Sequence, residues 1–210
     1  MTIDKDDFLN SIMASLDRIE QVDVNEIPSI DLYMDQLLTF MDDNLRKSSR
    51  HPGEDKILTK TMINNYAKND ILPPPVKKKY SKDHIILLIF IYYYKNILSI
   101  NDIHTLLKPM YDKFGNDEGI TLKDIYKTIY DEQDDIIEHL KADIKHKYEK
   151  SQEPYKDVTT SDKGELMLFN FISMLSYDVF MKMLLIETIL DKVEETRESK
   201  DSKDNKKKKK

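Results

Sequence analysis

The stretch LTKTMINNYAKNDILPPPVKKKYS, residues 58–81, contains the features that decide the fold. Thr59 can cap a helix, because a threonine hydroxyl accepts hydrogen bonds from the free backbone amides of the first turn. The apolar residues that follow lie on one side of this helix and leave a polar, basic face outside. Three prolines then end helical structure and hold the chain extended ahead of Lys77–Lys79. The stretch therefore predicts a short helix over Thr59 to Lys68 and a basic loop after it.

The composition of the 210-residue chain indicates a mostly helical protein. It has only four glycines and seven prolines, too few for the many turns of an all-β fold. It has no cysteine, which excludes disulfides, thiolate metal sites and cysteine nucleophiles. The acidic N-terminus MTIDKDDFLN has no apolar segment of the kind found in secretion signals, so we expect a cytoplasmic protein.

The net charge of −6 is unevenly distributed along the chain. Residues 56–110 have 9 basic and 3 acidic side chains, a net charge of +6, whereas residues 1–55 and residues 111–200 each have a net charge of −8. The last ten residues add +4. A basic block between two acidic ones suits binding to nucleic acid or another polyanion. An ordinary solvated lysine surface explains the charge alone equally well.

Hydrophobic periodicity predicts further helices on both sides of the opening stretch. We expect them over residues 4–24, from a cap at Ser29 or Asp31 through Arg46, from Ser81 to Lys95, and from Ser99 to Met110. The segment KSSRHPGED, residues 47–55, is predicted as a loop from its Ser, Pro and Gly content.

The C-terminal half of the chain has a different texture. Residues 121–150 predict one amphipathic helix, and residues 164–193 predict a strongly apolar one. The apolar helix approaches the length of a membrane span, but Asp178, Lys182 and Glu187 lie inside it. We therefore favour a helix buried in the core or in an oligomer, and we expect no membrane partner.

The predicted order of elements is that of a helix-turn-helix followed by a wing. A short helix with a polar outer face follows another helix, which is how a recognition helix is placed in the major groove of DNA. The lysines of the basic loop would attract phosphates, and Thr, Asn and Lys on the helix would bind base edges and backbone. The candidate DNA-binding residues are Thr59, Lys60, Thr61, Asn64, Asn65, Lys68, Lys77, Lys78, Lys79 and Tyr80.

Two family resemblances agree with this interpretation. The segment TKTMINNYAKNDILPPPVKKKYSKDHIILLIFI resembles the MerR-type winged helix-turn-helix. The combination of IDLYMDQLLTF, LTKTMINNY, PPPVKKKY and LSINDIHTLL is similar to the DUF1836 family, bacterial proteins of unknown function, over residues 30–110. The MerR resemblance implies a winged helix-turn-helix core that binds DNA.

The sequence also departs from the MerR pattern. Asn64 stands where that pattern has an arginine, and Asn65 takes the first position of its aromatic pair. Asp70 replaces a usual glycine, and the wing has no glycine turn. Residues 111–200 do not match the dimerisation helix or the effector domain of MerR proteins.

We thus interpret the chain as an all-α protein in four segments. These are an N-terminal helix (1–29), a winged helix-turn-helix domain (30–110), a helical C-terminal region for dimerisation or effector binding (111–196) and a disordered basic tail (197–210). We predict a DNA-binding transcriptional regulator that binds double-stranded DNA and forms a homodimer through residues 164–193. The operator and any small-molecule effector are not identifiable from the sequence.

Two other classes of function compete with DNA binding. A helical adaptor that has kept the scaffold without binding DNA is the alternative, and the acidic flanks and the departures at Asn64 and Asn65 favour it. An enzyme is the least favoured class, because no nucleophile elbow, phosphate-binding glycine loop or metal-ligand spacing occurs in the sequence. We therefore expect no catalytic residue, no metal and no cofactor.

Overall fold

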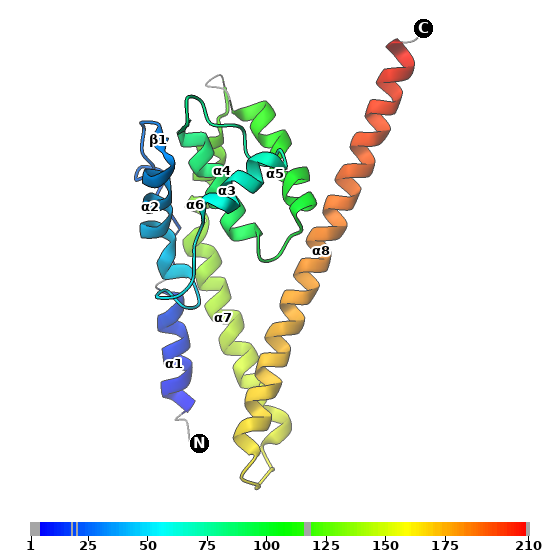
Figure 1. The fold of residues 1–210 in the computed structure, drawn as a ribbon. Coiled ribbons are helices and arrows are strands. Elements are labelled where there is room, and N and C mark those ends of the chain that lie inside the picture. Colours follow the sequence, from blue (N-terminus) through cyan, green and yellow to red (C-terminus); the bar gives the residue numbers. More distant parts are fainter. Residues whose placement is uncertain (1–4, 18, 20, 116–118, 209–210) are drawn as a thin grey trace.

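The computed structural model shows a mostly helical protein with one two-stranded antiparallel sheet among the residues it describes, which are 5–17, 19, 21–115 and 119–208. The shorter elements form a body, and α6 and α7 run nearly in line out of it (Figure 1). The long helix α8 returns from the end of α7 and passes the body on the side opposite α1, so that α7 and α8 form a V (Figure 1).

The elements of the body are bounded as follows: β1 Leu32–Tyr33, α2 Met34–Leu45, η1 Arg46–Ser48, α3 Lys60–Lys68, β2 Lys79–Tyr80, α4 Lys82–Tyr94, α5 Ile100–Phe114 and α6 Leu122–Asp131. Helix α1, Lys5–Leu16, packs instead on α7, where the ring centroids of Phe8 and Tyr148 lie 6.2 Å apart. The arm consists of α7 Gln133–Gln152, η2 Glu153–Tyr155 and α8 Lys163–Lys208. The structure confirms the prediction of a mostly helical, all-α protein.

Helix α4 forms the centre of the body. Its seven consecutive residues Ile85–Ile91 are all buried, so the helix is covered on every side. The surrounding helices each contribute apolar side chains to the same core: Leu37, Met41 and Leu45 from α2, Ile63 and Tyr66 from α3, Ile103 and Leu107 from α5, and Leu122 and Tyr126 from α6. Burying each such side chain contributes roughly 1.5–3 kcal/mol, and α4 buries more of them than any other single element of the body.

The N-terminal part of the chain differs from the prediction in two places. Helix α1 ends at Leu16, well short of the predicted residue 24. Neither Ser29 nor Asp31 caps α2, because Leu32 and Tyr33 form a strand whose antiparallel partners are Tyr80 and Lys79. Tyr33 takes the cap position instead, and its backbone N–H donates to Gln36 Oε1 at 2.9 Å. The extended pairing with β2 thus delays the start of α2.

Helix α5 does not end at Met110 as predicted but continues through Pro109 to Phe114. Proline has no N–H, so the carbonyl four residues earlier, that of Thr105, loses its helical donor. Arg197 of α8 donates to this carbonyl from Nη1 at 2.8 Å, and the Thr105 hydroxyl contacts Glu194. An apparent helix breaker therefore marks the place where α5 meets α8.

The helix predicted over residues 121–150 is divided at Glu132 into α6 and α7. On α6, the buried Tyr126 hydroxyl donates to the Val22 carbonyl at 2.6 Å, and on α7 Gln133 accepts from the Gln21 N–H at 3.0 Å. The segment after α1 is therefore fastened on both sides of the break. No glycine or proline announces this break in the sequence.

Helix α8 is not the buried core helix that was one of the predicted possibilities. Among the described residues, one helix, Lys163–Arg197, is long and apolar enough to cross a membrane by length and composition, and 6% of its most apolar window is buried. Helix α8 ends at Lys208, so it includes most of the segment 197–210 that was predicted as a disordered tail. The last two residues lie outside the described part.

Candidate nucleic-acid interface

The candidate recognition helix is α3, and its predicted start is confirmed. The Thr59 hydroxyl accepts a hydrogen bond from the Met62 N–H at 3.2 Å, as an N-cap does. Ile63 and Tyr66 are buried in the core, which fixes the side of the helix that faces inward. Because this side packs against the core, the opposite side of α3 faces the solvent.

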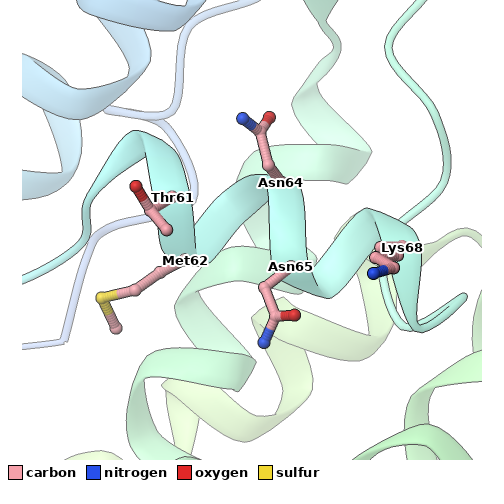
Figure 2. Close-up of a pocket in the computed structure, with 5 residues that line it drawn as sticks. All are labelled: Thr61, Met62, Asn64, Asn65 and Lys68. Carbon is pink, nitrogen blue, oxygen red and sulfur yellow. The ribbon is translucent and has the colours of Figure 1, made fainter.

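The outward side of α3 is polar and basic. Figure 2 shows Thr61, Met62, Asn64, Asn65 and Lys68 around a shallow depression of about 320 Å³, with the two asparagines on opposite edges of the helix. All of these except the half-buried Met62 are exposed, as is Lys60 at the start of the helix. These side chains offer hydroxyl, amide and ammonium groups, which are the groups that bind base edges and phosphates.

The C-terminus of α3 turns sharply at Asp70, whose φ of +56° lies in the left-handed region. The N–H of Ile71 donates to the Tyr66 carbonyl at 3.0 Å and that of Asp70 to Ala67 at 3.2 Å, a Schellman motif that usually has glycine at the position of Asp70. The Asp70 carboxylate lies 3.5 Å from Lys108 Nζ of α5. The usual glycine is thus replaced by a residue that ties α3 to α5.

The predicted wing is a two-residue hairpin. Val76 and Lys79 exchange backbone hydrogen bonds of 3.1 and 2.9 Å, and Lys77 and Lys78 between them have φ of +50° and +64°. Positive φ at both central residues defines a type I′ turn, in which Asn and Gly are strongly preferred. Lys77 and Lys78 are exposed at the tip.

The other two predicted wing residues serve the fold. Lys79 Nζ lies 5.0 Å from the ring centroid of Tyr33, a cation–π contact across the small sheet. Tyr80 is only 4% exposed and its ring meets His84 edge-on at 5.6 Å. The prediction that Tyr80 contacts DNA is therefore corrected, because its aromatic ring belongs to the core.

The buried His84 fixes the exit from the wing, a role that the sequence analysis missed. Its Nδ1 accepts from the Ser81 N–H at 3.1 Å, closing a capping box at the start of α4. Burial lowers the pKa of His84, and the backbone carbonyls of Pro74 and Pro73 partly oppose that shift. The Ser-x-x-His spacing was the available signal, since a polar residue three positions after a serine cap is typical of this motif.

A metal centre finds no support in the described part of the chain. Among residues 5–17, 19, 21–115 and 119–208, no group of three or more His, Asp or Glu side chains is placed to hold a metal ion.

Comparison with known protein families identifies the family of this chain. The sequence model of a family described as "Domain of unknown function (DUF1836)" matches residues 22–129. The chain belongs to this family. The DUF1836 match begins at the buried Val22 and ends within α6. It therefore extends beyond the predicted limits of 30–110 and covers α2, α3, α4, α5 and most of α6. No curated protein and no solved structure matches the chain.

Proposed function

We propose that this DUF1836 protein is a DNA-binding transcriptional regulator built on a winged helix-turn-helix. In this proposal α2 and α3 are the helix pair, α3 is the recognition helix and Val76–Tyr80 is the wing. The connection between the helices, residues 46–59, is longer than the usual turn of three or four residues. The resemblance to MerR-type proteins supports the same assignment. We propose for it a cytoplasmic location and no catalytic role.

The backbone of the wing tip is the observation that carries this proposal. Lys77 and Lys78 both adopt left-handed φ values that cost a side-chain-bearing residue roughly 1 kcal/mol or more each. Neither Lys77 nor Lys78 has a resolved carboxylate partner in the described part of the chain, so no ion pair offsets this cost. Their two positive charges sit at the tip of the hairpin that Val76 and Lys79 close, after α3 in the chain. Contact with DNA phosphates gives a reason for lysine at this strained position.

The exposed side chains of α3 supply the groups that could distinguish sequences. Asparagine can pair bidentately with adenine in the major groove, and each good contact of this kind discriminates against a wrong base by about 1–3 kcal/mol. Asn64 and Asn65 lie on the outward side with Thr61 between the helix start and Asn64 (Figure 2). We therefore assign sequence reading to α3 and phosphate binding to the wing lysines.

Two classes of substitution test this division of labour by fluorescence anisotropy on several labelled duplexes. Lys78→Ala should weaken binding to every duplex equally and reduce the slope of log affinity against log salt by about 1. Asn64→Ala or Thr61→Ala should change the order of preference among duplexes. Lys145→Ala, exposed on α7, is the matched control and should change neither. Equal effects of the α3 and wing variants on all DNA would refute the assignment of α3.

A helical interaction module without DNA binding is the second candidate function. The observation that favours it is the exposed apolar surface of α8, which no other part of the described chain covers. A folded protein that binds none of the duplexes would support this function. The search for protein partners would then begin at α8.

A further inference from the structure

An uncharged stripe runs along the outside of α8. It consists of Leu166, Phe169, Ser173, Tyr177, Phe180, Leu184 and Thr188, all of them exposed. These positions repeat with a period of eleven residues, which brings a helix back to within roughly 20° of its starting direction after three turns. The stripe therefore stays straight along the helix, and we call these seven residues the outer stripe.

The outer stripe has no charged residue, and the hydroxyl groups of its serine and its threonine are bonded within the helix. The Ser173 hydroxyl donates to the Phe169 carbonyl at 2.8 Å, and the Thr188 hydroxyl donates to the Leu184 carbonyl at 2.7 Å. Phe169 is 72% exposed and Tyr177 66%. Soluble monomers rarely expose a contiguous apolar patch larger than a few hundred Å². The outer stripe thus has the chemistry of a helix–helix seam that is open.

The opposite side of α8 is already fastened to the body and to α7. Phe171 is buried and its ring meets Tyr148 of α7 at 5.4 Å, while Asp178 lies 3.3 Å from Lys147 Nζ. Farther along, Leu190 is buried and Arg197 donates to α5. Figure 1 shows α8 passing the body with its outer side uncovered.

We propose that a second copy of this chain covers the outer stripe, with the two α8 helices antiparallel and Tyr177 at the two-fold axis. Lys163 lies fourteen residues before Tyr177 and Asp191 fourteen residues after it. An antiparallel pair therefore brings Lys163 of one copy beside Asp191 of the other, at both ends of the seam. Lys163 donates to the Lys156 carbonyl and still has donors free, because an ammonium group has three.

A parallel pair in the same register would place Asp191 beside Asp191 and lose this complementarity. A two-fold seam of self-complementary residues is the commonest way in which soluble chains pair. This pairing is independent of DNA binding, so the two proposals can fail separately.

A lipid bilayer is a less suitable occupant of this surface. To cross a membrane, α8 would have to leave α7 and give up the contacts of Phe171 and Asp178. Asp178 and Lys182, paired at 2.9 Å, lie near the middle of the apolar segment, where charges are expensive in hydrocarbon. Pairing with a second copy keeps every one of these contacts.

Single cysteines test the seam directly, because the chain has none of its own. Tyr177→Cys should form a disulfide-linked dimer under mild oxidation at least ten times faster than Val179→Cys. Val179 is also exposed, at 52%, but it lies roughly 200° around the helix from Tyr177, on a line that runs into the contact with α5. Equal rates for the two variants would overturn the proposal.

A mixture of two further variants tests the antiparallel orientation. Phe169→Cys mixed with Leu184→Cys should give a mixed disulfide dimer faster than Phe169→Cys gives dimers with itself. Rapid self-linking of Phe169→Cys, at the rate of Tyr177→Cys, would overturn the antiparallel register.

The molar mass in solution tests for the dimer without any disulfide cross-link. Light scattering should give the wild-type protein twice the chain mass of 24.8 kDa, and Phe180→Glu the mass of one chain with an unchanged helical circular-dichroism spectrum. Val179→Glu, the control, should remain dimeric. A wild-type protein that is monomeric and floats with phosphatidylglycerol vesicles would identify lipid as the occupant and overturn the proposal.

Discussion

Asp70, Lys77 and Lys78 are the residues other than glycine with left-handed φ in the described part of the chain, and all three lie between α3 and α4. At two of these places the MerR pattern has glycine, at the position of Asp70 and in the wing turn. The left-handed backbone conformation that glycine adopts most readily is thus adopted here by one aspartate and two lysines. Asp70 gains a contact with Lys108 in exchange, whereas Lys77 and Lys78 form no ion pair within the described chain.

A double substitution at the wing tip should separate stability from binding. Lys77→Asn combined with Lys78→Gly places the preferred residues in a type I′ turn, so the free energy of unfolding in urea should rise by about 1 kcal/mol. The affinity for all DNA should fall at the same time, because two positive charges are removed. A variant that is more stable and binds DNA unchanged would show that the lysines have no part in binding.

The buried His84 should make stability sensitive to mild acid. Since burial lowers its pKa in the folded state, the unfolded chain takes up this proton first as the pH falls below about 6.5. The free energy of unfolding therefore decreases as the pH falls from about 6.5 towards the lower pKa of the folded state. His84→Gln keeps an acceptor for the Ser81 N–H but cannot titrate. Urea unfolding at pH 7.5 and pH 5.5 should show a smaller loss of stability in this variant than in the wild type, and an equal loss would contradict the role.

At the scale of elements, the join between α5 and α8 depends on one proline. Arg197→Met should lower the free energy of unfolding by about 1 kcal/mol, because the Thr105 carbonyl then has no donor. In a Pro109→Ala background, the N–H of residue 109 is restored and can donate to the Thr105 carbonyl. Arg197→Met should then lower the free energy of unfolding by at least about 0.5 kcal/mol less than it does in the wild type. Lys192→Met, on the exposed side of α8, is the control. Identical costs in both backgrounds would refute the explanation.

The elements that the sequence predicted best are those with both a cap and an apolar face. Helix α3 has the Thr59 cap and the buried pair Ile63 and Tyr66, and its bounds agree with the prediction. The start of α2 was mispredicted because the strand pairing of Leu32 with Tyr80 sets it. The end of α5 was mispredicted because a hydrogen bond from Arg197 stabilises the helix across Pro109. These partners are far away in the sequence, so local patterns contain no signal for them.

At the scale of the whole molecule, periodicity identified α8 as apolar but not what covers it. The same run of Leu, Met, Phe and Ile is compatible with a core, an oligomer seam or a membrane span, since composition does not record neighbours. Seven residues of the candidate site are exposed on α3 and the wing tip: Lys60, Thr61, Asn64, Asn65, Lys68, Lys77 and Lys78. Exposure of these seven could be predicted from helical spacing and the prolines, whereas the burial of Tyr80 depends on its ring meeting His84.

Titration of the purified protein into fluorescent DNA, at two salt concentrations, tests the central claim most directly. One duplex should be the promoter region upstream of the protein's own gene and the other a scrambled version of it. We predict tighter binding to the promoter duplex and a steep loss of affinity at the higher salt concentration. Equal, salt-sensitive binding to both duplexes would contradict sequence reading by α3, and no binding by a folded sample at either salt would contradict DNA binding altogether.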